Sequence, residues 1–159
     1  EGKEIELQPW VHQPPSDAEN ESAESIMEQI FQKLFNKNVS YQHWVDLVNK
    51  CEEQIVFDSK NQRIAYLVMA SQKQWLKEPM TVNISSWVRM MNGILGNGKE
   101  MQQADISKKW NDMRTQSFYH SSSAMYEQLN FKSENITKKF YDKLRQNVQS
   151  ICEIERNNY

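Results

Sequence analysis

Glycine and proline are scarce in this sequence, with four of each among 159 residues. Neither residue occurs between Ser16 and Glu78, and neither follows Gly98. Sheet-rich folds place turn residues every few positions, whereas helical bundles need them only between helices. The scarcity therefore argues against a sandwich or a barrel and predicts an all-α fold.

An excess of positive charge and a long apolar run are also missing. The formal net charge is −2, so electrostatics does not favour a nucleic acid or an anionic membrane as a partner. No apolar stretch is long enough to span a bilayer, so we expect no transmembrane segment. Aromatic residues nevertheless make up 11% of the chain, which is typical of a folded domain and not of a disordered one.

Sequence patterns that carry catalytic or metal chemistry are absent as well. No zinc-binding, calcium-binding or P-loop motif occurs, and the glycine cluster at 93–98 follows a helical pattern instead of a strand. The three histidines stand apart, at His12, His43 and His120. We therefore expect a protein that is not an enzyme and that uses no cofactor and no metal.

What the sequence does contain is apolar residues at helical spacing, in five to six amphipathic stretches. An extended N-terminal arm is expected over 1–15, because Pro14 and Pro15 block a helix, followed by a single helical-bundle domain over 16–159. The first expected helix covers 17–36, and a second begins at about 40 and stops at a break over 58–61. A third helix follows this break and ends at 79. The remaining expected helices are 83–95, 99–118 and one that begins at about 133. One long helix over 40–78 is the alternative to that break.

Polar residues and glycines mark the expected helix ends. Ser40, Ser59 and Asn83 are predicted N-terminal caps, and Gly93 with Gly96 can supply a left-handed C-terminal cap. Four N-x-S/T sequons begin at Asn20, Asn38, Asn83 and Asn135. Two interpretations stay open: the asparagines and their hydroxyl partners cap helices, or they are glycosylated in a secretory compartment.

Tryptophan and methionine are the most distinctive residues. Trp44, Trp75 and Trp87 lie on apolar faces and are expected in the core. Burial explains Trp10 and Trp110 less well, and exposed tryptophan is favoured at binding hot spots, while methionine surfaces adapt to different partners. We therefore predict a partner-binding surface that includes a groove near 87–113, with ordinary core filling as the alternative; its candidate residues are Trp10, Trp87, Met90, Met91, Met101, Trp110 and Met113.

The two cysteines, Cys51 and Cys152, both fall on apolar stripes. They are either two buried free thiols or one disulfide, which would close a loop of about 100 residues and stabilise the fold by about 4–5 kcal/mol in the chain-entropy model. The sequence does not choose between these states. His43 precedes Cys51 by about 12 Å along one helix, which is too far for a catalytic dyad.

One stretch resembles a known family. Trp44, the Asn- and Lys-rich composition and the segment Pro79-Met-Thr-Val-Asn-Ile-Ser-Ser-Trp87 are similar to the PHIST-type helical domains exported by malaria parasites. The resemblance covers about 40–95; Trp75 comes later than the second tryptophan of the family pattern, and 99–130 lacks an obvious Phe-rich stretch. It implies a non-enzymatic adaptor that binds cytoplasmic tails or cytoskeletal proteins of the host red cell.

These observations favour a helical protein-interaction domain whose protein partner the sequence does not name. A secreted helical ligand or surface antigen with one disulfide is the second hypothesis, and a carrier of an apolar small molecule between helices is the third. An exported or secreted location is favoured over a cytoplasmic one.

Overall fold

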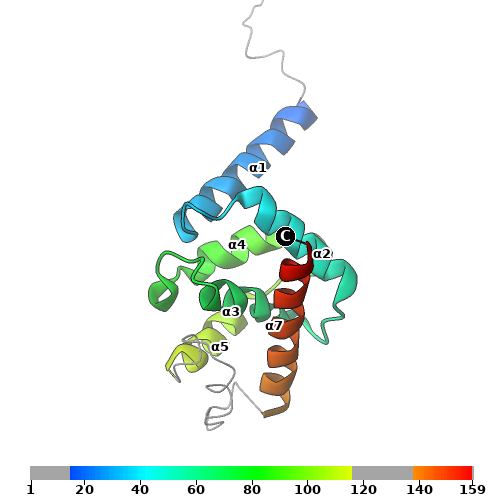
Figure 1. Ribbon diagram of the computed structural model, residues 1–159. Helices are drawn as coiled ribbons and strands as arrows, with labels where there is room; N and C mark the ends of the chain where they lie inside the picture. The colour runs from blue at the N-terminus through cyan, green and yellow to red at the C-terminus, as the bar shows by residue number, and fades with distance from the viewer. Residues whose placement is uncertain (1–14, 116–137, 159) are drawn as a thin grey trace, which may run out of the picture.

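Six α-helices make up most of the protein in the computed structural model, which describes residues 15–115 and 138–158 (Figure 1). Two short 3-10 helices, η2 (Lys60–Ile64) and η3 (Pro79–Thr81), accompany them. The described residues contain no strand, only one isolated antiparallel bridge between Phe35 and Leu76. The prediction of an all-α fold is confirmed. The α-helices are α1 (Pro15–Leu34), α2 (Tyr41–Gln54), α3 (Ala65–Gln72), α4 (Ile84–Leu95), α5 (Gln103–Thr115) and α7 (Lys138–Asn158).

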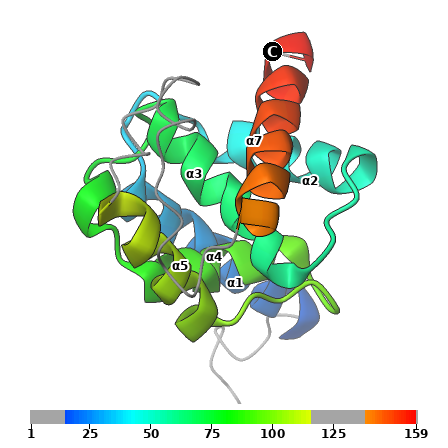
Figure 2. The same cartoon turned by 90° about the horizontal axis from the view of Figure 1, so that it is seen from below.

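The helices surround α3, which lies against α7 (Figure 2). The C-terminal half of α1 packs on α4, and α4 in turn contacts α2 and α5. The first turns of α1 project beyond the rest of the molecule (Figure 1). Pro15 already belongs to α1, so the expected arm boundary is one residue late, and the remainder of the arm lies outside the described residues.

Of the two N-caps predicted for the second and third helices, Ser40 is confirmed and Ser59 is not. The Ser40 hydroxyl accepts a hydrogen bond from the His43 backbone amide at 3.0 Å, which confirms it as the N-cap of α2. The break at 58–61 is also confirmed, because α2 ends at Gln54 and η2 begins at Lys60. The predicted side-chain cap at Ser59 is wrong: its hydroxyl makes no capping bond, and its carbonyl accepts from the Gln62 amide instead.

The third helix is shorter and more deeply buried than expected. It was expected to end at 79, but α3 ends at Gln72, where a turn follows in which Gln74 has a φ of +60°. Every residue from 65 to 71 is buried, so α3 has no polar face. Other segments cover α3 on all sides. The sequence predicted an amphipathic helix with one apolar face, and that prediction underestimates how much of α3 is buried.

The two glycines of α4 have different roles. Asn83 caps the helix start as predicted, accepting from the Ser86 amide at 3.0 Å. Gly96 is the C-cap with a φ of +87°, but its ψ of −172° lies outside the left-handed helical region that was expected. Gly93 lies inside the helix and is not the cap. A Cβ atom at Gly93 would lie 2.7 Å from the Met27 sulfur, so this glycine permits the close approach of α1 and α4.

An aromatic cluster connects five segments of the core. Trp44 of α2 is fully buried, with ring centroids of Phe35 at 5.0 Å and Trp87 at 5.7 Å. Tyr66 of α3 and Trp75 lie edge-on to it, each at 6.2 Å. Edge-to-face contacts of this kind add to the stabilisation from burial. The predicted core positions of Trp44 and Trp87 are confirmed, whereas Trp75 is only half-buried.

The apolar stripe of the last helix is also confirmed where the structure describes it. Leu144, Val148 and Ile151 are buried, and α7 packs against α2 and α3. The expected helix start near Ser133 lies outside the described residues.

Trp44→Ala should lower the free energy of unfolding by about 3–5 kcal/mol, because it removes a large buried ring and leaves a cavity. Denaturant unfolding followed by circular dichroism measures this loss. Val56→Ala is the control: this side chain is 82% exposed, so we expect a change within about 0.5 kcal/mol. Equal effects of the two substitutions would contradict the central place of Trp44.

Candidate partner-binding site

The predicted groove of tryptophan and methionine is not on the surface. Its residues from α4 and α5 pack into the core, and Trp110, which was expected to be exposed, is only 2% exposed. Six of the seven candidates are buried, namely Trp87, Met90, Met91, Met101, Trp110 and Met113. Trp10 lies outside the described residues. The groove prediction is therefore wrong, and core filling, the alternative, describes these six side chains.

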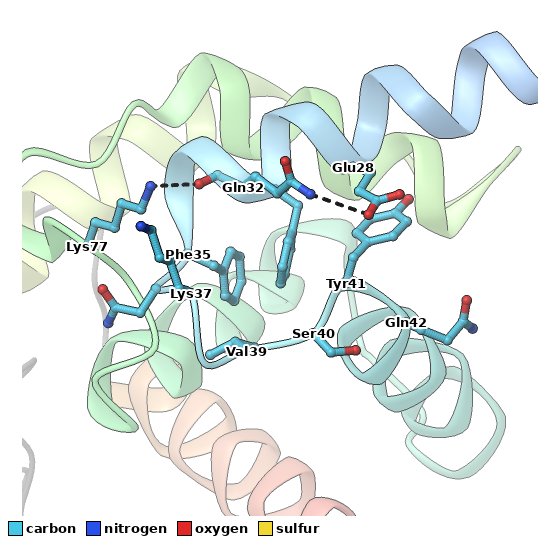
Figure 3. A pocket seen from close by; sticks show the side chains of 11 residues that line it. Glu28, Gln32, Phe35, Lys37, Val39, Ser40, Tyr41, Gln42 and Lys77 are labelled. Carbon is cyan, nitrogen blue, oxygen red and sulfur yellow. Dashed lines mark hydrogen bonds between the residues drawn. The ribbon is translucent and has the colours of Figure 1, made fainter.

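A surface pocket of about 730 Å³ lies elsewhere, between the end of α1 and the start of α2 (Figure 3). Its residues come from the last two turns of α1, the turn at 36–40, the first turn of α2 and Lys77. α1 and α2 diverge from this turn (Figure 1), and the lining residues place the pocket beside it.

Aromatic rings form one wall of this pocket. Phe31 and Phe35 are stacked with their centroids 4.1 Å apart, and Tyr41 meets Phe31 edge-on at 5.4 Å. Both phenylalanines are almost fully buried, whereas Tyr41 is half-buried. Phe35 also stacks on Trp87 at 5.7 Å, so the core beneath fixes the position of the wall.

Charged and polar side chains form the rim. Lys37 and Lys77 stand at one end of the pocket, and Glu28 stands at the other (Figure 3). Gln32 lies between them and donates a hydrogen bond from Nε2 to Glu28 Oε2 at 3.4 Å. The pocket therefore offers an apolar wall together with a positive and a negative end.

Backbone hydrogen bonds position Lys77 at this rim although it is far from α1 in sequence. The Asn36 amide donates to the Trp75 carbonyl at 2.7 Å, and the Lys77 amide donates to the Leu34 carbonyl at 2.9 Å. The Asn36 side chain adds a bond from Nδ2 to the Gln74 carbonyl at 2.8 Å. Lys77 Nζ then donates to the Gln32 carbonyl at 2.8 Å, near the negative end of the helix dipole.

A second polar cluster is buried beside α3. Arg63 donates two hydrogen bonds to Glu52, from Nη2 to Oε1 at 2.7 Å and from Nε to Oε2 at 3.0 Å. Tyr66 donates its hydroxyl to Glu52 Oε2 at 2.7 Å, and Lys99 Nζ lies 3.5 Å from Oε1. The neighbouring residues Glu52 and Glu53 of α2 differ in exposure. Glu53 is exposed, but the Glu52 side chain is only 8% exposed.

The surroundings of Glu52 determine its ionisation. Burial alone would raise the pKa of this carboxyl group. The hydrogen bonds from Arg63 and Tyr66 and the positive charges of Arg63 and Lys99 outweigh burial and hold the pKa below its ordinary value. The partners of Glu52 join α2 to η2, α3 and the loop before α5. Because they occupy both carboxylate oxygens, the cluster offers no open position for a substrate.

No group of three or more histidine, cysteine or acidic side chains among the described residues could hold a metal ion. No helix within 15–115 or 138–158 is long and apolar enough to cross a membrane. Comparisons with protein-family models, curated proteins and solved structures find no match. The candidate site therefore rests on the geometry of this chain.

Sequence reasoning expected the apolar face of the first helix in the core and missed the pocket. Phe31 and Phe35 belong to the apolar stripe expected for the first helix, and Ser40 is the predicted N-cap of the second helix. Lys37 and Lys77 carry no sequence signal, because single lysines at helix ends are common and solvated. The backbone bridge between 35 and 76, which brings them together, joins segments far apart in the chain.

Lowering the pH should destabilise the fold through Glu52. A carboxyl group with a lowered pKa in the folded state contributes stability above its unfolded pKa, near the ordinary value of 4.5, and loses it as the pH falls through the folded pKa. Glu52→Gln should remove this part of the acid dependence and cost about 3–5 kcal/mol at neutral pH, because Arg63 stays buried without its counter-charge. Urea unfolding at several pH values measures both effects.

Glu53→Gln provides the matched control, since Glu53 is the exposed neighbour on the same helix. We expect its free energy of unfolding to follow the wild-type curve within about 0.5 kcal/mol. If Glu52→Gln and Glu53→Gln gave the same acid profile, the buried ion pair would not be the source of the pH dependence.

Proposed function

We propose that this chain is a non-enzymatic protein-interaction domain, and that it binds a short segment of a partner protein in the pocket between α1 and α2. The observation that carries the proposal is the combination of an aromatic wall with oppositely charged ends. Pockets that bind ligands generally pair apolar surface with a few polar groups that fix orientation. The pocket has that composition.

The charges at the rim select among partner segments. Lys37 and Lys77 favour a carboxylate at their end, and the surface of Tyr41 favours an apolar or aromatic side chain in the middle. Lys77 already donates to the Gln32 carbonyl of α1. Lys37 is therefore the rim cation whose replacement changes the charge and leaves that hydrogen bond in place. The proposed occupant is therefore a short acidic peptide segment with an apolar anchor.

The resemblance to PHIST-type domains suggests where such a partner is found. We propose an adaptor exported into a host red cell that binds a cytoplasmic tail or a cytoskeletal protein there. The support is the tryptophan pattern of residues 40–95, in which Trp44 and Trp87 contact one another in the core directly behind the pocket wall.

Selection from a library of short random peptides, with the wild-type chain as bait, tests the proposal. We expect enrichment of acidic peptides that carry an apolar or aromatic residue. Lys37→Glu should then weaken their binding by about ten-fold or more, since it places like charges against each other at the rim. Isothermal titration calorimetry measures this change.

Lys60→Glu makes the same change of charge at an exposed residue of η2, away from the pocket, and should alter affinity less than about two-fold by long-range electrostatics. Equal losses in both variants would indicate non-specific attraction and contradict the pocket as the binding site. Failure to enrich any peptide, together with a lipid retained in native mass spectrometry, would favour the apolar-carrier hypothesis instead.

A further inference from the structure

Both cysteines lie where α2 packs against α7. Cys51 is fully buried on α2, and Cys152 is half-buried on α7 at the edge of the same core. Both are free thiols in the structure. The two helices contact each other directly, and the views in Figures 1 and 2 both place the C-terminal half of α7 beside α2.

Contacts on either side define how the two helices align. Toward the start of α2, His43 Nε2 lies 3.5 Å from Glu155 Oε2, near the end of α7. Toward the end of α2, Gln54 lines the same shallow depression as Ser150. Both contacts involve the C-terminal part of α7, where Cys152 lies, and Cys51 lies between His43 and Gln54 on α2.

The ionisation of the thiols supports this placement. Burial raises the pKa of Cys51 to about 12, with the charge of Glu52 and the neighbouring Cys152 as further causes. Burial also raises the pKa of Cys152, although the positive charge of Lys73 acts in the opposite direction. Because both pKa values are raised, both thiols are protonated at neutral pH.

We propose that Cys51 and Cys152 form a dithiol site that a low-molecular-weight disulfide, such as oxidised glutathione, converts to an intramolecular disulfide between α2 and α7. This inference is independent of the proposed function, because the thiols lie away from the α1–α2 pocket. Neither residue belongs to that pocket or to the Glu52 cluster.

The reaction proceeds in two exchange steps. The Cys152 thiolate, which is the more accessible sulfur, attacks one sulfur of oxidised glutathione; a mixed disulfide forms and one glutathione thiolate leaves. The Cys51 thiolate then attacks the Cys152 sulfur, so the protein disulfide forms and the second glutathione leaves. Two protein protons are released to the two glutathione thiolates. The protein dithiol is oxidised, and one molecule of oxidised glutathione is reduced to two molecules of glutathione.

The product would connect α7 to α2 across most of the sequence. A disulfide that closes a loop of about 100 residues restricts the unfolded chain strongly. It would persist in an oxidising compartment and be reduced in a reducing one. The site would therefore give the same chain a more stable and a less stable form according to its surroundings.

The test treats the folded full-length chain with oxidised glutathione at mildly alkaline pH, where more of each thiol is ionised. We expect both thiols to disappear together, the intact mass to fall by two hydrogens, and the chain to stay monomeric in gel filtration. Peptide mapping without reduction should identify the Cys51–Cys152 pair, and thermal unfolding should shift to higher temperature and return on reduction.

Single substitutions separate the two steps. Cys51→Ser should stop at a stable glutathione adduct on Cys152, because the second sulfur is gone. Cys152→Ser should leave the buried Cys51 unmodified while the chain is folded. Circular dichroism confirms that each variant is folded. A wild-type chain that keeps a stable adduct on Cys152, that couples only between molecules, or that forms the pair only after denaturation would overturn the proposal.

Discussion

The packing of the Trp44 ring is the contact on which the rest of the structure depends. Its neighbours come from the end of α1, from α3, from the turn after α3 and from α4, so one indole joins four segments that are far apart in sequence. Aromatic side chains bury large areas and prefer defined relative orientations, which restricts how the helices can pack. Removing this ring would leave the helices without a shared centre.

The candidate pocket follows from the same packing. Phe35 lies between Trp44 and Trp87 on one side and Phe31 on the other, so the wall of the pocket is an extension of the core. The backbone bridge at Phe35 and Leu76 then brings Lys77 to the rim. Because the core packing and the backbone bridge already fix the wall and the rim, little free energy is spent on ordering the pocket when a partner segment binds.

Local patterns in the sequence predicted the features that depend on neighbouring residues. The spacing of apolar side chains predicted most helices, and Ser40, Asn83 and Gly96 act as caps because capping involves residues only a few positions away. Burial by distant segments could not be read in this way: α3 is covered on every side, and the methionines of α4 and α5 fill the core. The buried position of Glu52 was not predicted, because its partners Arg63, Tyr66 and Lys99 reach it only after folding. The pocket rim was missed for the same reason.

Nuclear magnetic resonance mapping of a peptide selected by the chain would test the central claim most directly. In a titration followed by amide chemical shifts, the account predicts changes clustered at residues 28–42 and at Lys77, around the pocket between α1 and α2. Shifts confined to another surface, such as the depression lined by Asp58, Phe140 and Lys143, would contradict it.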